Sequence, residues 1–183
     1  MVGFSGIWNG RGKKAKAAAR ALYARVAEAA LDTGLYAQGA AIDTFEGRAA
    51  MVTAHAALVI GRLRRIGSAQ ARKTAESLNH LVLDGFDAAF RELGVGDSSI
   101  ARKVRKLAEV HYGIGKSLSV ALDQPAPGRT GALIDTIQRN GLTQPGQEGR
   151  LAEYLLQNQA ALDATTDDSI LAGNFDWSTL RQD

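Results

Sequence analysis

The sequence predicts an all-α protein, a single-domain bundle of about six helices. Apolar residues recur with helical spacing through most of the chain, and no segment keeps the alternation of a half-buried strand. The composition agrees, because the 183 residues are 45% hydrophobic and 6% aromatic, with 3 prolines and no cysteine. A chain of this length buries roughly 70% of its unfolded surface, so one core suffices without a disulfide.

The chain divides into an N-terminal arm, residues 1–13, and a helical domain, residues 14–183. The arm places its charges after its apolar residues, the reverse of a secretory signal, so we expect no export. A first helix is predicted from about Lys14 to Thr33, where Gly34 ends it. Its inner stripe consists of Leu22, Val26 and Ala29. A loop containing Leu35, Tyr36 and Phe45 follows.

Two longer helices come next, from about Gly47 to Ile66 and from about Ala69 to Leu93. The longest apolar run, 56–60, lies in the first of these and is far too short to span a membrane. The second helix stacks its apolar residues on one stripe, namely Leu78, Val82, Phe86, Ala89 and Leu93.

A tight turn then leads into a basic helix. Gly94 suits the left-handed position after a helix end, Gly96 continues the turn, and Asp97 or a following serine offers an oxygen to cap the next helix. That helix ends before Gln124. Its inner arc is Ile100, Val104, Leu107, Ala108 and His111. Its outer face carries Arg102, Lys103, Arg105 and Lys106.

The C-terminal part begins with a break at Pro125, Pro127 and Gly128, which we interpret as a long loop and not as a domain boundary. A short helix around 133–139 and another from about 147 to 164 follow. The last segment, 167–183, resembles a cap on the body. Its predicted anchors are Phe175 and Trp177.

The charge is unevenly distributed. Residues 1–112 carry 17 Lys and Arg against 10 Asp and Glu, whereas residues 113–183 carry 5 against 9. The asymmetry favours a basic surface that faces an anionic partner or membrane leaflet, although a merely solvated surface fits as well. A second basic run opens the first helix, with no acid before Glu28. It consists of Arg11, Lys13, Lys14, Lys16 and Arg20.

The cations leave an RNA- or ribosome-associated binding protein as an alternative function. Against it, no aromatic residues are interleaved with the charges, and no recognised RNA-binding module is present.

Two polar residues, His55 and Arg62, lie on the apolar face of the predicted second helix. Burial without a partner is costly, so each side chain must be satisfied. One interpretation is a core histidine with its hydrogen bonds made and an arginine paired with a buried carboxylate. The other places both at the floor of a groove for a partner segment.

No catalytic or metal-binding arrangement stands out. The serines lack a strand–turn–helix elbow, and the GVG of the turn follows a helix and not a strand. Spacing favours ion pairs His80–Asp84 and Asp87–Arg91 over a metal site. Axial haem ligation by His55, His80 or His111 has no attachment motif behind it. We therefore expect no enzyme, no metal and no cofactor.

The residues resemble the ubiquinol–cytochrome c chaperone family, the bacterial relatives of the mitochondrial cytochrome b assembly factor. The likeness runs in order along nearly the whole chain. It is carried by Leu22-Tyr23, Leu35-Tyr36, Asp43 to Arg48, Met51, His55, Leu58, Arg62, Leu63, Asp84, Asp87, Arg91 to Asp97, Lys103, Lys106, Tyr112-Gly113, Arg139-Asn140, Leu151-Ala152, Tyr154, Gly173 and Phe175.

The chain departs from the family pattern at two places. An aromatic residue and an acid commonly follow the Gly-Arg pair, where this chain has Ala49 and Ala50. An arginine often follows Tyr-Gly, and here the residue is Ile114. Such a member is expected to bind its client differently.

The resemblance implies an all-helical, non-enzymatic assembly factor that binds nascent or unassembled cytochrome b during biogenesis of ubiquinol–cytochrome c reductase. It implies a cytoplasmic protein at the inner membrane or near the ribosome exit. Candidate partner contacts are His55, Arg62, Asp84, Arg91, Lys103 and Lys106. Gly94, Gly96 and Asp97 are expected to shape the turn that aims the basic helix.

Overall fold

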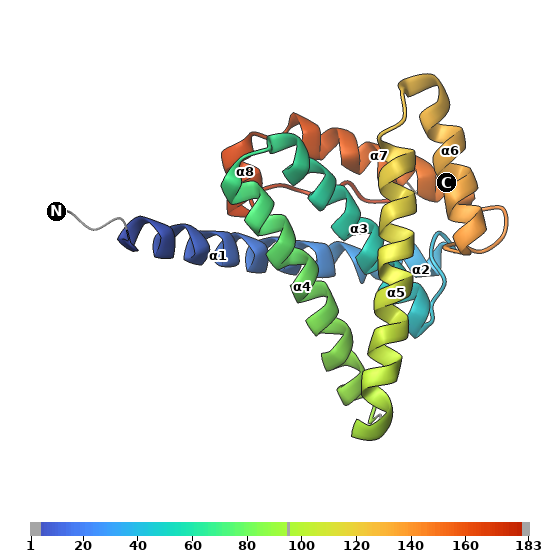
Figure 1. Cartoon of the computed structure of the whole chain (residues 1–183). Helices are drawn as coiled ribbons and strands as arrows, with labels where there is room; N and C mark the ends of the chain where they lie inside the picture. The colour runs from blue at the N-terminus through green and yellow to red at the C-terminus, as the bar shows by residue number, and fades with distance from the viewer. Residues whose placement is uncertain (1–4, 95, 181–183) are drawn as a thin grey trace.

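The computed structural model describes residues 5–94 and 96–180, with side chains from residue 12 onward except those of Asp97 and Ser98. The fold is all-α, as predicted (Figure 1). Within the described residues six long helices are joined by two short ones. The long helices are α1 (Ser5–Ala30), α3 (Phe45–Ile66), α4 (Ala69–Glu92), α5 (Asp97–Leu122), α6 (Ala126–Asn140) and α7 (Glu148–Ala164). The short ones are α2 (Thr33–Ala37) and α8 (Asp167–Ala172).

Helix α3 is the centre of the molecule and packs against α1, α4, α5 and α7. Neighbours on several sides require small residues around the helix, and α3 supplies four buried alanines, Ala49, Ala50, Ala54 and Ala56. Its ends are well capped. The Thr44 hydroxyl accepts a hydrogen bond from the Gly47 amide (3.0 Å), and Gly67 ends the helix at φ +69°.

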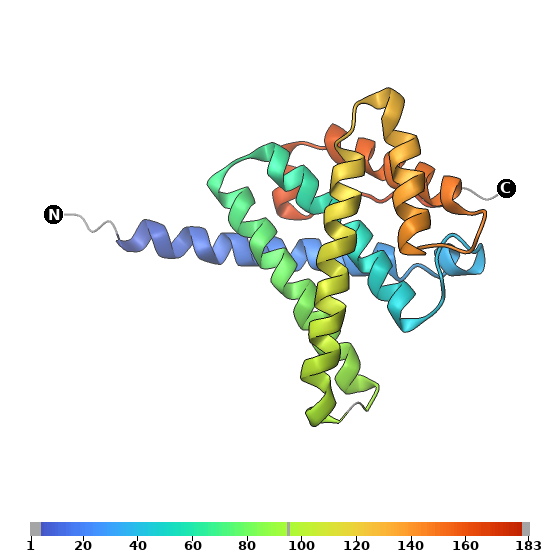
Figure 2. The same cartoon turned by 45° about the vertical axis from the view of Figure 1, so that its right-hand side comes forward.

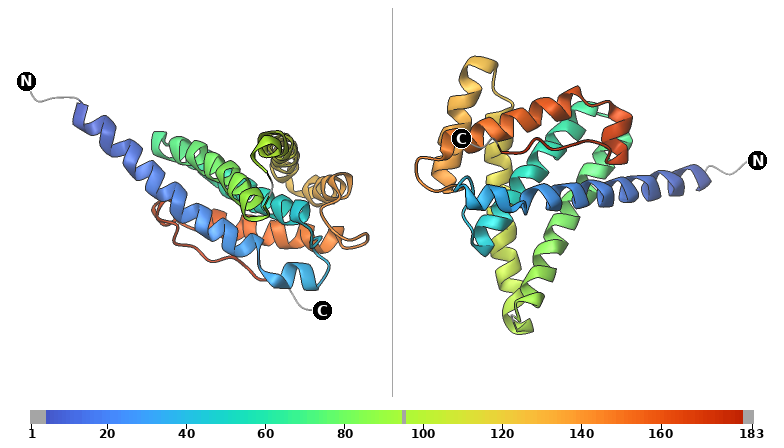
Figure 3. Two further views of the ribbon diagram at one scale, coloured as in Figure 1. Left: turned by 90° about the horizontal axis from the view of Figure 1, so that it is seen from below. Right: turned by 180° about the vertical axis from the view of Figure 1, so that it is seen from behind.

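Helices α1 and α4 cross closely on one side of α3. A side-chain carbon at Gly85 would overlap the Tyr23 hydroxyl, so the Tyr23 side chain keeps its position between the helices only because residue 85 is glycine. The N-terminal part of α1 extends beyond the body, as the views from below and behind show (Figure 3). Helices α4 and α5 converge at the turn that joins them. This turn projects on one side of α1, whereas α6 and α7 lie on the other side (Figure 2).

The N-terminal elements differ from the prediction. Helix α1 begins at Ser5, inside the segment 1–13 that was predicted as an arm. Extending an alanine-rich helix costs far less than starting one, which outweighs the weak propensity of the glycines there. The helix also ends at Ala30 and not at Thr33, because Asp32 caps the separate helix α2 through the Gly34 amide (2.8 Å).

The proline-rich break is shorter than predicted. Pro125 occupies the N-cap of α6 and Pro127 lies in its first turn, where the missing amide proton and the fixed φ of proline are tolerated. The helix therefore begins at Ala126 and not near residue 133.

The last described residues, 174–180, form an extended strap over α1 and α7. Phe175 is buried, and the Trp177 indole Nε1 donates to the Arg25 carbonyl oxygen (2.8 Å). The Ser178 amide donates to Asn158 Oδ1 (2.8 Å). Both predicted anchors therefore hold the strap to the body.

Candidate functional site

His55 lies wholly inside the protein, between α3 and α7. Its Nδ1–H donates to the Met51 carbonyl oxygen (2.8 Å), and its Nε2 accepts from the Tyr154 hydroxyl (2.8 Å). The ring also contacts Trp177 edge-on, with 5.1 Å between centroids. Burial lowers the pKa of His55 to about 4, so the ring is neutral at physiological pH. His55 is therefore a core histidine whose two ring nitrogens both have hydrogen-bond partners, which is the first of the two interpretations of the sequence.

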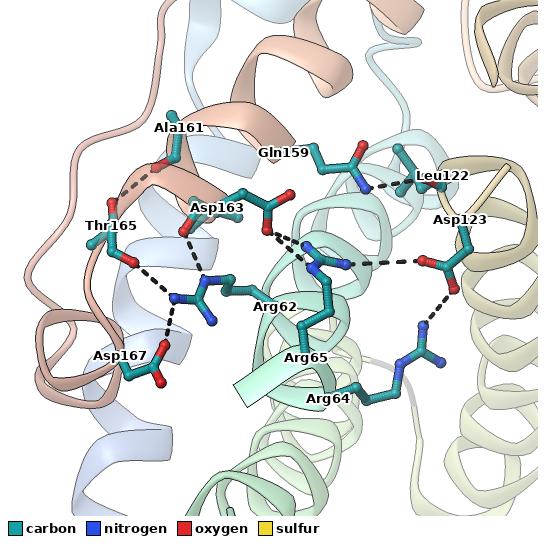
Figure 4. Close-up of polar contacts among 11 residues, drawn as sticks. Arg62, Arg64, Arg65, Leu122, Asp123, Gln159, Ala161, Asp163, Thr165 and Asp167 are labelled. Carbon is teal, nitrogen blue, oxygen red and sulfur yellow. Dashed lines mark hydrogen bonds and ion pairs between the residues drawn. The ribbon is translucent and has the colours of Figure 1, made fainter. Parts of the chain in front are cut away.

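Arg62 fixes the C-terminal end of α7. Its Nε donates to the Leu162 carbonyl oxygen (2.9 Å), and one terminal nitrogen reaches the Thr165 carbonyl oxygen (2.8 Å) and Asp167 Oδ1 (2.6 Å) (Figure 4). Carbonyls at a helix end have no partner inside the helix, so the guanidinium satisfies them. The carboxylate of Asp167 is itself largely exposed, contrary to the buried acid that was predicted.

We call the contacts of His55 and Arg62 with α7 and α8 the α3–α7 seam. Both side chains are buried in it, with both ring nitrogens of His55 and two of the three guanidinium nitrogens of Arg62 bonded inside the protein. Neither is available at the surface, so their role as partner contacts stays a prediction that would require the seam to open.

Two further arginines extend this pattern at the end of α3. Arg65 donates through Nε (3.0 Å) and Nη2 (2.7 Å) to Asp163 Oδ1 of α7, and Arg64 reaches Asp123 (3.2 Å) after α5 (Figure 4). Every arginine in the last two turns of α3 is thus paired with a neighbouring element.

The candidates on α4 lie apart from the seam. Asp84 is exposed, and the pair of Asp87 with Arg91 forms as predicted (2.8 Å). The pair of His80 with Asp84 does not form among the described contacts. Leu93, expected on the inner stripe, is 63% exposed because the helix has already left the body at that point. The described residues contain no group of three or more His, Cys, Asp or Glu suited to a metal ion.

The turn between α4 and α5 has the predicted left-handed glycine, Gly94, at φ +70°. The N-cap of α5 is Gly96, one residue before the predicted cap, and the Ser99 hydroxyl donates to the Gly96 carbonyl oxygen (3.0 Å). Asp97 is the first residue of the helix, and its side chain lies outside the described residues. A glycine N-cap costs only a few tenths of a kcal/mol against serine, which explains how it is tolerated.

We call the four cations of the N-terminal half of α5 the α5 basic face; they are Arg102, Lys103, Arg105 and Lys106. All four are exposed, and no described acid forms an ion pair with any of them. The inner arc behaves as expected, since Ile100, Leu107 and His111 are buried.

Two of these cations, Lys103 and Lys106, border a groove between α3, α4 and α5 with a volume of about 300 Å³. We call it the α5 groove. Its other lining residues are Phe45, Glu46, Ala49, Ala50, Thr53, Phe90, Leu107, Val110 and His111. Lys103 Nζ lies 5.9 Å from the centre of the Phe90 ring, within the range of a cation–π contact.

His111 is the buried histidine among the lining residues of this groove. Its Nε2 lies 3.0 Å from Asn79 Oδ1, and its Nδ1 lies 2.8 Å from the Thr53 hydroxyl, which is also 2.9 Å from the Ala49 carbonyl oxygen. Burial lowers the pKa of His111. The polar groups at the floor are therefore satisfied within the protein.

Sequence reasoning found the two lysines of the groove but not its apolar lining. Phe45 was assigned to a loop, although it is the first residue of α3 and stacks on Phe90 with 4.6 Å between centroids. Val110 could have been found, since it follows Lys106 by one turn on a helix face that is otherwise polar. Ala49 and Ala50, where the chain departs from the family pattern, both line the groove.

The first helix carries a second set of cations. Lys13, Lys14, Lys16 and Arg20 are exposed, and no described acid pairs with them. Arg11, the other cation of this run, has a side chain outside the described residues. Ala15, Ala18 and Ala19 are buried on the opposite side, so the cations occupy the free face of α1.

Comparison with known proteins identifies the family. The model described as "Ubiquinol-cytochrome C chaperone" matches residues 37–177, more than three quarters of the chain. The chain belongs to the ubiquinol–cytochrome c chaperone family. The match includes the α3–α7 seam and the whole α5 groove, and it assigns the protein a chaperone role in assembly of that respiratory complex.

A solved structure supports the same assignment. The crystal structure of the Cbp3 homolog from Brucella abortus superposes with a TM-score of 0.78 and is 25% identical, covering 97% of this chain and 98% of that chain. No curated protein matches this chain.

Proposed function

We propose that this family member is a chaperone that binds nascent or unassembled cytochrome b and delivers it to ubiquinol–cytochrome c reductase. It works as a binding protein and catalyses no reaction. It acts in the cytoplasm, peripherally attached to the inner membrane. Its cationic surfaces make the contacts with the membrane or the ribosome exit region.

The observation that carries this proposal is the family match over residues 37–177, because that segment contains every candidate contact residue. The charge distribution supports it. Exposed cations without acid partners on α1 and α5 are stable in water, yet they attract anionic surfaces and acidic segments. Among the described helices, none combines the length and apolarity needed to cross a bilayer.

Deletion of the gene tests the proposal directly. Membranes of the deletion strain should lose most of the b-type cytochrome absorbance of the complex, and a plasmid copy should restore it. A tagged copy, purified from detergent-solubilised membranes, should bring cytochrome b with it. Unchanged b-type absorbance in the deletion strain, together with no cytochrome b in the purified fraction, would rule the function out.

A second candidate, an RNA- or ribosome-associated binding protein, is favoured by the cation run of α1. Phosphate contacts make the affinity fall steeply as salt is added. In a plot of the logarithm of the binding constant against the logarithm of the salt concentration, the slope is close in size to the number of contacts. The affinity for purified ribosomes should therefore fall strongly when the salt concentration is raised from about 50 to about 200 mM, the range over which phosphate contacts are weakened. A flat salt response would exclude ribosomal RNA as the partner.

A further inference from the structure

We propose that the α5 groove binds an apolar segment of polypeptide that has acidic residues on one side, with that side toward Lys103 and Lys106. The inference rests on the proposed function, because it names the kind of client segment that this chaperone would hold. It adds the place on the molecule, the chemistry of the segment and its orientation.

The lining of the groove determines the apolar part of the ligand. Its apolar lining consists of the Phe45 and Phe90 rings, which are in contact, together with Leu107, Val110, Ala49 and Ala50. The two alanines fill little of the space, which leaves room for large side chains from outside. A volume of about 300 Å³ is at the lower end of the range for ligand sites, so the groove accepts a few side chains and not a folded domain.

The polar groups of the groove argue against a polar small molecule. Thr53 and His111 already bond to each other, and His111 also bonds to Asn79. The two buried side-chain atoms without a partner in the described residues belong to Arg25 and Thr74, neither of which lines the groove. Because no buried polar side-chain atom among the described lining residues lacks a partner, burial of apolar surface must supply most of the affinity.

The charges at the rim determine the orientation. Lys103 and Lys106 border the groove on the α5 side, whereas the exposed Glu46 borders it on the α3 side. An acidic residue of the segment is therefore attracted toward α5 and repelled from the start of α3. Such rim charges contribute more to specificity and association rate than to total affinity.

A neighbouring hollow shows why this groove is the better candidate. It lies beyond Thr53 and His111 and is lined by Arg64, Ser119 and Asp123 among others. There Arg64 already pairs with Asp123, which leaves Lys116 as the one lining cation without a described acid partner, against two such lysines in the α5 groove. The α5 groove combines an apolar lining with cations that have no described acid partner.

The helix offers a matched pair of substitutions that separates the groove from the rest of α5. Val110 lines the groove and is 45% exposed, whereas Val120 is 57% exposed, lies on the same helix and does not line it. Val110→Glu places a charge on the apolar wall, and Val120→Glu is its control. Lys106→Glu reverses a rim charge, and Arg102→Glu is the control on the same helix.

The probe is a fluorescein-labelled synthetic peptide with a Leu-Phe-Leu segment followed on one side by two glutamates. Anisotropy should show at least about ten-fold weaker binding with Val110→Glu and Lys106→Glu, and less than about two-fold change with either control. A peptide with lysine in place of each glutamate should bind wild type at least about ten-fold more weakly. Circular dichroism and urea unfolding confirm that each variant folds.

Three results would overturn the inference: equal losses for the groove variants and their controls, a preference for the lysine-containing peptide, or no peptide binding.

Binding to vesicles of phosphatidylglycerol is a separate experiment. Their binding, if blocked by Val110→Glu while the peptide does not bind, would assign the groove to an anionic lipid instead. Cytochrome b capture by the same variants distinguishes the two proposals. Capture that Val110→Glu leaves unchanged contradicts the groove alone, whereas absence of cytochrome b from the wild-type fraction contradicts the function.

Discussion

The α3–α7 seam and the α5 basic face use the same residue types in opposite ways. In the seam, Arg62 bonds to two backbone carbonyls and one carboxylate, and His55 has both ring nitrogens bonded. On the α5 basic face, all four cations are exposed and no described acid forms an ion pair with them. The seam ties helices together, whereas the face is left open to a partner.

The difference shows that the clustering of cations in the sequence does not reveal whether they are paired inside the protein or exposed. The element that packs against each cation decides its role. The end of α3 lies against α7, whose last carbonyls and following acids attract arginines. The N-terminal half of α5 projects with the end of α4, and among the described residues no other helix lies on its outer side (Figure 1).

The largest expected effect is on the seam. Arg62→Met should destabilise the protein by about 3 kcal/mol, because it leaves the carbonyls of Leu162 and Thr165 and the Asp167 carboxylate without their donor. Urea unfolding followed by circular dichroism measures it. Arg64→Met is the control and should cost under about 1 kcal/mol, since that residue lies at the surface. Equal costs would mean that burial does not distinguish the two arginines.

A pH dependence should come from His55. Its pKa is lowered to about 4 in the folded protein, whereas the unfolded value is near 6.5. The unfolded chain therefore binds more protons between these values, so the stability is complete above pH 6.5 and falls as the pH drops toward 4. Between pH 7 and pH 5 the loss from this group should be about 2 kcal/mol.

Comparison with His55→Gln isolates that contribution from those of the carboxylates. The variant should be less stable at pH 7 but should lose about 2 kcal/mol less than wild type between pH 7 and pH 5. Parallel pH profiles for the two proteins would show that His55 is not the titrating group.

A smaller effect is expected for Arg65, which pairs with Asp163 at the surface. Arg65→Ala should cost under about 1 kcal/mol, because both partners are partly exposed and water screens them. The double variant with Asp163→Ala should cost little more than the single one. Exposed ion pairs contribute at most about 1 kcal/mol. A coupling energy between Arg65 and Asp163 well above that value would show that this pair behaves like the buried contacts of the seam.

The smallest effect on stability is expected on the α5 basic face. Lys103→Glu with Lys106→Glu should change the free energy of unfolding by within about 0.5 kcal/mol, since neither lysine has a described acid partner to lose. The same pair should abolish restoration of b-type cytochrome in the deletion strain. Large destabilisation by this variant would show that the lysines support the fold.

Much of the fold followed from periodicity and end signals. The second and third predicted helices match α3 and α4 to within two residues, because capping threonine, serine and glycine mark their ends. The starts of α1 and α6 were wrong. Glycine near Ser5 and proline near Ala126 are weak in a helix interior, yet both are tolerated in the first turns.

The site was less predictable. The sequence singled out Lys103 and Lys106 from the clustering of like charges on one helical face. It could not assign Phe45, Phe90 and Val110 to the same groove, because they come from three helices whose crossing places them together. Similarly, His55 and Arg62 were recognised as unusual, but their partners lie about one hundred residues away in the chain.

The sequence by itself determined the helical class, the two runs of cations, the glycine turn at Gly94 and the family resemblance, since each depends on neighbouring residues or on residue order. The tertiary structure alone decided which cations are bound internally and which border an apolar groove. The physical reason is that a charge is satisfied by whatever packs against it, and packing partners are set by helix crossings that no local pattern encodes.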